Sequence, residues 1–156
     1  MSIRSFFLSS EGDNPELSNT TVDEINRLLF HLSPGKVRTP HDLTSFGKIL
    51  DQGTRVFCIG DFGGCQDPEA VIAMASLITI PKLTGISGEV HDVVVDQDYQ
   101  GQGYGKRIIE EVIAFAKSIG MIHLDLTSRK SREAANHLYE SLSFQKRDTN
   151  YYRLVL

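Results

Sequence analysis

The sequence lacks several features that would place it in a special class of protein. Its 156 residues include only two cysteines, Cys58 and Cys65, which do not form the Cys-x-x-Cys spacing of a zinc or redox site. No apolar run approaches the roughly 20 residues of a membrane-spanning helix. The N-terminus also lacks the basic, apolar and small-residue order of a secretion signal. We therefore expect two free thiols, no metal, no membrane association and a cytoplasmic location.

A surplus of basic residues is missing too. The chain has 16 Lys and Arg against 20 Asp and Glu, which gives a formal net charge of −4 at pH 7. Proteins that bind nucleic acid usually carry a basic surface, so we expect no nucleic-acid partner. No internal repeat, low-complexity tract or linker interrupts the sequence. Residues 1–156 are therefore expected to form a single domain with a substantial core.

The most informative stretch runs from residue 88 to residue 120. Val93–Val95 are three consecutive β-branched residues and predict a strand. The glycine-rich segment 100–105 follows, and helical spacing of apolar residues begins directly behind it. A glycine loop before a helix start presents backbone N–H groups to an anion, and Lys106 and Arg107 add positive charge. The pattern predicts a phosphate-bearing ligand at this loop.

The spacing of the glycines excludes two common phosphate loops. A P-loop needs Gly, four residues and then Gly-Lys-Ser/Thr, but here Gln100 takes the first glycine position and Arg107 the last position. A dinucleotide fingerprint needs a glycine at its sixth position, which is Lys106 when counted from Gly101. Too little chain follows to complete that fold. A glycine turn without any ligand is the remaining alternative, and the cost of ordering three glycines disfavours it.

The same loop resembles a known family. Gln100-Gly101-Gln102-Gly103-Tyr104-Gly105 fits the Gln/Arg-x-x-Gly-x-Gly/Ala signature of the GNAT superfamily of N-acetyltransferases. In that superfamily the loop binds the pyrophosphate of acetyl-CoA. The strands expected at 89–95 and 122–127 and the segment 132–144 also resemble conserved blocks of the family. The likeness therefore covers about half of the chain, from residue 88 to the end.

The resemblance implies an α/β (α+β) fold of the GNAT type. Such a fold has a mixed central sheet of six to seven strands and about four helices, and it is splayed between the fourth and fifth strands. The residue patterns along the chain predict a comparable set of strands and helices. The expected strands cover residues 3–9, 55–60, 71–80, 89–95 and 122–127, with a last hairpin at 151–156, and the expected helices cover about 20–32, 42–51, 106–119 and 132–141. The long apolar run at 71–80 predicts a central strand.

Acetyl transfer to an amine needs a base, a donor for the thioester oxygen and an acid for the leaving thiolate. The resemblance implies Glu89 as the base, with His91 as its partner or substitute, acting directly or through a water. It implies the backbone N–H near Val93 as the donor and Tyr139 as the acid. Strict strand alternation would place Glu89, His91, Val93 and Val95 on one face.

The resemblance also implies a set of coenzyme contacts. The expected acetyl-CoA-binding residues are Val93, Val94, Val95, Gln100, Gly101, Gln102, Gly103, Tyr104, Gly105, Lys106, Arg132 and Asn136. Two positions depart from the family pattern, because Ser143 stands where a glycine is usual and Arg132 where an asparagine is frequent. Arg129 and Lys130 are interpreted either as phosphate contacts or as a solvated helix entry.

The acceptor is left open by the sequence. His31, Lys36, Arg38 and His41 could form a pocket for an acidic acceptor, but an ordinary solvated loop is the favoured interpretation. We expect a primary amine of a small molecule or peptide; within enzymes, an amino-sugar phosphate and a protein N-terminus are alternatives. A catalytically silent CoA-binding module and a nucleotide-dependent oxidoreductase are rival functions. Members of the family often dimerise, so a homodimer is compatible with the resemblance.

Overall fold

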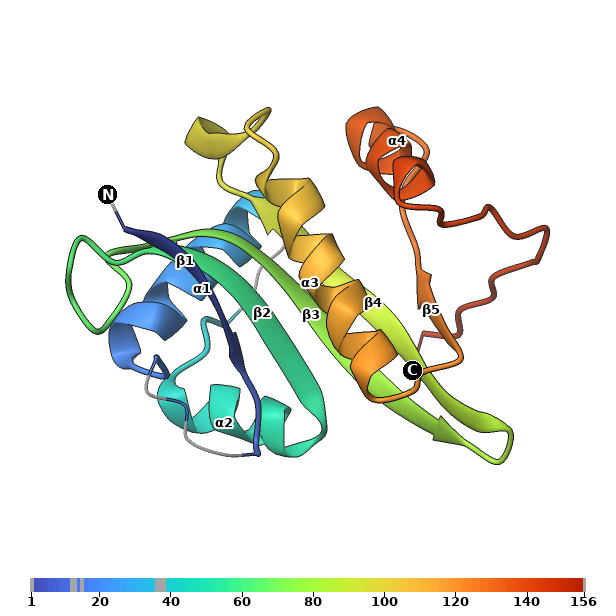
Figure 1. The fold of residues 1–156 in the computed structure, drawn as a ribbon, viewed down its shortest axis with the longest axis horizontal. Helices are drawn as coiled ribbons and strands as arrows, with labels where there is room; N and C mark the ends of the chain where they lie inside the picture. The colour runs from blue at the N-terminus through green and yellow to red at the C-terminus, as the bar shows by residue number, and fades with distance from the viewer. Residues whose placement is uncertain (1, 12–13, 15, 36–38, 156) are drawn as a thin grey trace.

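The structure is a computed structural model that describes residues 2–11, 14, 16–35 and 39–155. Its centre is a mixed sheet of five strands in the order β1-β2-β3-β4-β5 (Figure 1). The first four strands pair antiparallel, and β5 pairs parallel to β4. The strands are β1 (Ile3–Leu8), β2 (Thr54–Asp61), β3 (Ala70–Lys82), β4 (Gly85–Val95) and β5 (His123–Leu126). As predicted from its long apolar run, β3 is the central strand.

Four α-helices cover the two faces of this sheet. They are α1 (Asn19–Leu32), α2 (Leu43–Asp51), α3 (Tyr104–Ser118) and α4 (Glu133–Ser141), with a short 3-10 helix η1 (Gln97–Tyr99) before α3. Buried side chains of α1 and α2 form one core cluster with β1–β3, and those of α3 and α4 form a second cluster on the other face. Figure 1 shows α3 lying across the face opposite α1 and α2.

Local sequence explains where the first two helices begin. Ser18 caps α1 because its hydroxyl accepts a hydrogen bond from the N–H of Thr21 at 3.2 Å. Thr21, whose side chain could also cap a helix, is instead buried inside the first turn. Asp42 and Ser45 form a reciprocal capping box at the start of α2.

The number of strands differs from the expected six to seven. The described residues contain five, because residues 145–155 form no strand. Aromatic and β-branched residues favour a strand there, but strand formation requires a hydrogen-bonded partner and burial of one face. Tyr151, Tyr152, Leu154 and Val155 are instead 73–84% exposed. The link expected at 81–87 is also shorter, because β3 and β4 extend to Lys82 and Gly85 and form a tight hairpin.

The pairing between β4 and β5 is short. It joins Ser87 to His123 and ends where Val90 meets Leu126, whereas β4 continues along β3 as far as Val95. This divergence corresponds to the splay expected between the fourth and fifth strands. One backbone edge of β4 beyond Val90 is therefore outside the β5 ladder.

Helix α4 ends in a Schellman motif. Ser143 adopts a left-handed conformation with φ 69°, and its N–H donates to the Glu140 carbonyl at 3.0 Å. The Phe144 N–H donates to the Tyr139 carbonyl at 3.0 Å, and the two rings pack edge to face with centroids 6.0 Å apart. This conformation explains why glycine would suit position 143.

Replacing Ser143 with glycine should stabilise the protein. A non-glycine residue in the left-handed region costs roughly 1–2 kcal/mol, so Ser143→Gly should raise the free energy of unfolding by up to about 1 kcal/mol. Urea unfolding measures this change. Ser141→Gly, inside the same helix, should have the opposite sign because glycine costs roughly 0.5–1 kcal/mol there. Equal effects of the two substitutions would contradict the role assigned to Ser143.

Candidate functional site

A β-bulge reorients the side chains of β4 near its end. The register between β3 and β4 shifts after the pair Ser76–His91, and Asp92 adopts a positive φ of 51°. The Ser76 hydroxyl donates to the Asp92 carboxylate at 2.9 Å. Aspartate is among the residues that tolerate this conformation, but nothing in the sequence required it here.

The bulge corrects the face assignment made from strict alternation. Val90, Val93 and Val95 all pack in the cluster with α3, whereas Val94 packs in the cluster with α1 and α2. Glu89, next to Val90, points to the α1 side of the sheet. The prediction that Glu89 shares a face with Val93 and Val95 is therefore wrong.

Glu89 and His91 meet on the α1 side of β4. The His91 Nε2 and the Glu89 Oε2 are 3.2 Å apart, and both side chains are about half exposed. The β4–β5 register places Glu89 beside Asp125, which itself lies 3.4 Å from His123. Two carboxylate–imidazole pairs thus lie next to each other where β4 and β5 begin to diverge.

The glycine loop has the properties expected of an anion site. Gly103 is the N-cap of α3 with φ 87°, and no side chain caps this helix start. The first helical hydrogen bond runs from the Arg107 N–H to the Gly103 carbonyl at 3.0 Å. The N–H groups of Tyr104, Gly105 and Lys106 therefore have no acceptor within the helix. Such donors, together with the helix dipole, favour an anion at this position.

Side chains of the loop brace it from within. Gln100 donates through Nε2 to the Val95 carbonyl at 3.3 Å, and Gln102 donates to the Asp98 carbonyl at 3.1 Å. Both glutamines therefore tie the loop to the segment between β4 and α3. Both side-chain amides therefore donate to backbone carbonyls of the protein itself.

The two basic residues at the start of α3 behave differently. Lys106 is exposed and lies 3.8 Å from Glu110. Arg107 instead donates to the Ser5 hydroxyl at 2.8 Å and pairs with Glu111 at 3.5 Å, so it links α3 to β1. The expectation that Arg107 adds its charge to the loop is therefore wrong.

Tyr139 is buried on the other face of β4, in the cluster that contains Val93 and Val95. Burial raises the pKa of the Tyr139 hydroxyl, although the positive charge of Arg132 lowers it. The net shift is upward, so the hydroxyl carries its proton at neutral pH and can act as a donor. The structure does not bring Tyr139 into contact with Glu89 or His91, because these lie on the opposite face.

Two further residues expected to bind coenzyme make contacts within the protein. Arg132 donates to the Leu32 carbonyl at 3.1 Å and so joins the start of α4 to the end of α1. Asn136 donates to the carbonyls of Arg129 at 3.1 Å and Lys130 at 3.4 Å, which orders the turn before α4. Their expected coenzyme contacts stay predictions.

The segment interpreted as a solvated loop, or alternatively as part of an acceptor pocket, is described only in part. Lys36 and Arg38 lie outside the described residues. The backbone of His41 is fixed by the Asn26 side chain, which accepts from its N–H at 2.9 Å and donates to its carbonyl at 2.8 Å. This arrangement joins the segment before α2 to α1.

Sequence reasoning missed two charged residues beside the loop. Arg27 on α1 pairs with Glu24 and with Asp96, which directly follows β4. Burial raises the pKa of Asp96, but the Arg27 guanidinium and the Asp98 N–H lower it to below its usual range. The Glu24–Arg27 pair has helical i,i+3 spacing and was visible in the sequence, whereas the contact with Asp96 was not.

The remaining special groups lie elsewhere. Cys58 is buried, which raises its thiol pKa, and Cys65 is exposed; both are free.

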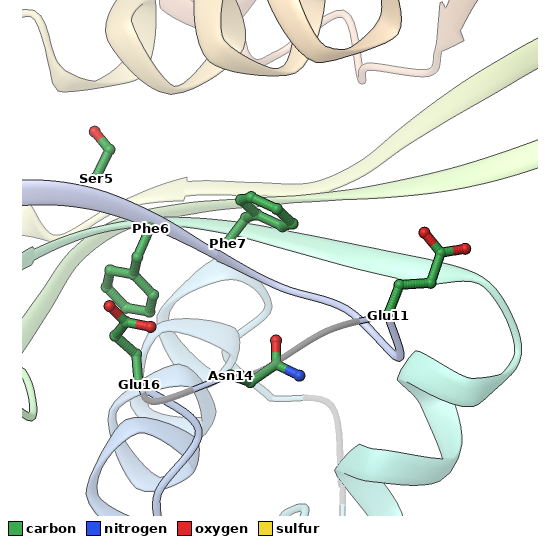
Figure 2. A pocket seen from close by; sticks show the side chains of 6 residues that line it. All are labelled: Ser5, Phe6, Phe7, Glu11, Asn14 and Glu16. Atoms are coloured by element: carbon green, nitrogen blue, oxygen red, sulfur yellow. The ribbon is translucent and has the colours of Figure 1, made fainter. Parts of the chain in front are cut away.

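Across the described ranges, no three His, Cys, Asp or Glu side chains are grouped to hold a metal ion, and no helix is long and apolar enough to span a membrane. A pocket of about 300 Å³ lies beside β1. Its lining residues, labelled in Figure 2, include none of the predicted site residues.

Comparisons with known proteins identify the family and the fold. A family model described as Acetyltransferase (GNAT) family matches residues 23–144. N-alpha-acetyltransferase RimI of Mycobacterium tuberculosis is 31% identical over 83 residues, which cover 53% of this chain and 51% of that protein. Glucosamine 6-phosphate N-acetyltransferase of Trypanosoma brucei brucei is 34% identical over 95 residues, which cover 59% of this chain and 58% of that protein. The chain thus spans about half the length of these curated relatives.

Solved structures share the fold. The crystal structure of a Trypanosoma brucei acetyltransferase superposes with a TM-score of 0.77 at 23% identity and covers 99% of this chain and 100% of that chain. At this identity the likeness concerns the fold alone.

Alanine should be tolerated at one loop glycine and not at another. Gly103→Ala should lower the free energy of unfolding by roughly 1–2 kcal/mol, because residue 103 has φ 87°. Gly105 is helical, and a Cβ there would lie 3.4 Å from Leu138 and 3.5 Å from Val95, which are ordinary contacts. Gly105→Ala should therefore be neutral or stabilising by up to about 1 kcal/mol. Urea unfolding measures both, and equal stabilities would contradict the loop geometry.

Proposed function

Because this chain belongs to the acetyltransferase (GNAT) family, we propose that it is an N-acetyltransferase that moves an acetyl group from acetyl-CoA to a primary amine by direct transfer. The uncapped start of α3 behind the glycine loop carries this proposal. Its free N–H groups suit the diphosphate of the coenzyme, which is an anion of the right size for a helix start. Lys106 adds a charge at the same end of the helix.

The divergence of β4 from β5 gives the pantetheine arm a place to lie. Beyond Val90, one edge of β4 is outside the β5 ladder, so its backbone groups are available to an extended amide-containing chain. A thioester held there would lie near Val93, whose N–H would stabilise the oxyanion of the tetrahedral intermediate. The side chains of Val93 and Val95 remain in the core.

The two faces of β4 suit the two proton transfers. The base must reach the incoming amine, and the acid must reach the departing sulfur on another side of the carbonyl carbon. Glu89, paired with His91, would take the proton of the amine directly or through a water. Tyr139 would give its proton to the thiolate. The N–C bond forms, the C–S bond breaks, and the products are an amide and free CoA.

The charges near Glu89 favour one class of acceptor. Glu89 and Asp125 are neighbours in the sheet register, so two carboxylates lie on the face where the acceptor would bind. Like charges repel, and an amino-sugar phosphate would bring further negative charge to this face. We therefore favour an amine of a peptide or of a small molecule without phosphate.

Removing the Tyr139 hydroxyl should slow the chemical step. Tyr139→Phe keeps the packing against Phe144, so stability and acetyl-CoA affinity should change little, while kcat falls by about 10²–10⁴. Release of free thiol, followed with a panel of peptide and small amines, measures this. Tyr151→Phe, at an exposed position, is the control. Full activity of Tyr139→Phe would assign the acid to another group.

The roles of the carboxylate and imidazole can be separated. If Glu89 is the base, Glu89→Gln should lower kcat/KM by about 10² or more, and His91→Gln should lower it less, because it retains a hydrogen-bonding group beside Glu89. The measurement is kcat/KM against pH for both variants. A larger loss in His91→Gln would make the imidazole the base.

A further inference from the structure

Three charged side chains join α1 to the end of β4. The Arg27 guanidinium lies 2.8 Å from the Glu24 carboxylate and also contacts the Asp96 carboxylate. The side chains of Arg27 and Glu24 are 34% and 21% exposed, and that of Asp96 is only 10% exposed. We call Glu24, Arg27 and Asp96 the Arg27 bridge. A carboxylate this deeply buried needs a partner for its charge, and Arg27 supplies that partner.

The bridge lies where β4 leaves the sheet. The last β3–β4 pair is Ala73 with Val95, and the Asp96 N–H still donates to the Ile72 carbonyl at 2.8 Å. At Val71, the next β3 residue toward the N-terminus, side chains of α1 take the place of β4 as hydrogen-bond partners. Glu24 accepts from the Val71 N–H at 3.1 Å, and Arg27 donates to the Val71 carbonyl at 3.1 Å. Glu24 and Arg27 thus satisfy the edge that β4 no longer pairs.

Asp96 also starts the path toward the glycine loop. One of its carboxylate oxygens accepts from the Asp98 N–H at 3.0 Å, and its carbonyl accepts from the Tyr99 N–H at 3.0 Å. Asp96 is therefore the N-cap of η1, whose last residue is followed directly by Gln100. Any shift of Asp96 would move the entry to the loop, which Gln100 and Gln102 tie to the same segment.

We propose that Arg27 is a positioning residue for the coenzyme: it holds Asp96 at the end of β4, offsets its negative charge beside the diphosphate site, and so sets the affinity for CoA without touching it. The inference rests on the proposed function, because it assumes that the loop binds the diphosphate. Without Arg27, the buried Asp96 carboxylate would be both unpaired and repulsive toward that diphosphate. Because Arg27 belongs to α1, the wall on the acceptor side is joined to the coenzyme loop.

The test compares CoA binding, measured by calorimetry, in the wild type and three variants. Arg27→Ala should weaken CoA binding by about tenfold. Arg27→Ala/Asp96→Asn should recover affinity to within about threefold of the wild type, because it removes the unpaired charge while an amide oxygen can still accept from Asp98. Arg55→Ala is the matched control: it removes the contact with Glu11 at 3.0 Å, far from the loop, and should leave affinity within about twofold.

The recovery distinguishes positioning from simple stabilisation. If the bridge only stabilises the fold, the double variant should bind CoA no better than Arg27→Ala, and Arg55→Ala should lose comparable affinity. Either result, or unchanged affinity in Arg27→Ala, overturns the inference while the proposed function stands. A wild-type protein that binds no CoA refutes the proposed function and the inference with it.

Hydrogen exchange provides a readout without ligand. In Arg27→Ala, the amides of Asp96, Asp98 and Tyr99 should exchange faster, while those of the β1–β2 ladder keep their wild-type rates. If Arg27→Ala does not fold, Arg27→Lys takes its place, because lysine keeps the charge but cannot bind Glu24, Asp96 and the Val71 carbonyl with one planar fork. The CoA affinity and the amide exchange rates of Arg27→Lys should then lie between the wild-type values and those expected for Arg27→Ala. Wild-type values for both quantities would overturn the inference.

Discussion

The early end of the β4–β5 ladder is the constraint on which the rest of the structure depends. Parallel pairing stops at Val90, although β4 continues for five more residues along β3. A buried sheet normally satisfies every backbone group, so an edge left outside the ladder needs another partner. The fold meets this need differently on each side of β4. On the β3 side, β4 is paired as far as Val95, and beyond it Glu24 and Arg27 of α1 bond the backbone of Val71 in β3. On the β5 side, the residues of β4 beyond Val90 lie outside the ladder.

A single irregular residue in β4 decides which face of the sheet each candidate site residue lies on. Asp92, at positive φ, inserts one residue into β4 and reverses the alternation of the residues that follow. Glu89 and His91 therefore lie on the α1 side, while Val93 and Val95 pack toward α3 and Tyr139. With regular alternation, Glu89 and the partly buried Val93 and Val95 would lie on the same face of the sheet.

The protein has a net charge of −4, and most basic residues near the glycine loop are paired with groups of the protein itself. The proposed anion site would consist mainly of backbone N–H groups at the start of α3, with few basic side chains. Arg107 is committed to Ser5 and Glu111, and Arg132 to the end of α1. Arg27 offsets the buried carboxylate of Asp96, which precedes the loop. Binding at the proposed site would therefore depend on the direction of the backbone more than on the number of cations.

The sequence by itself determined the elements whose causes are local. Residue types within a few positions predict the Val93–Val95 strand, the glycine loop and the apolar stripe of α3. The order of the elements as far as α4 could be predicted in the same way. Contacts between distant residues were decided only by the tertiary structure. Arg27 and Asp96 are 69 positions apart, and the bulge at Asp92 depends on its partner strand. Among the described residues of the tail, 151–155 pair with no strand. Spacing along a chain encodes helical and strand periods, whereas the direction of a charged side chain and the end of a ladder depend on which surfaces meet after folding.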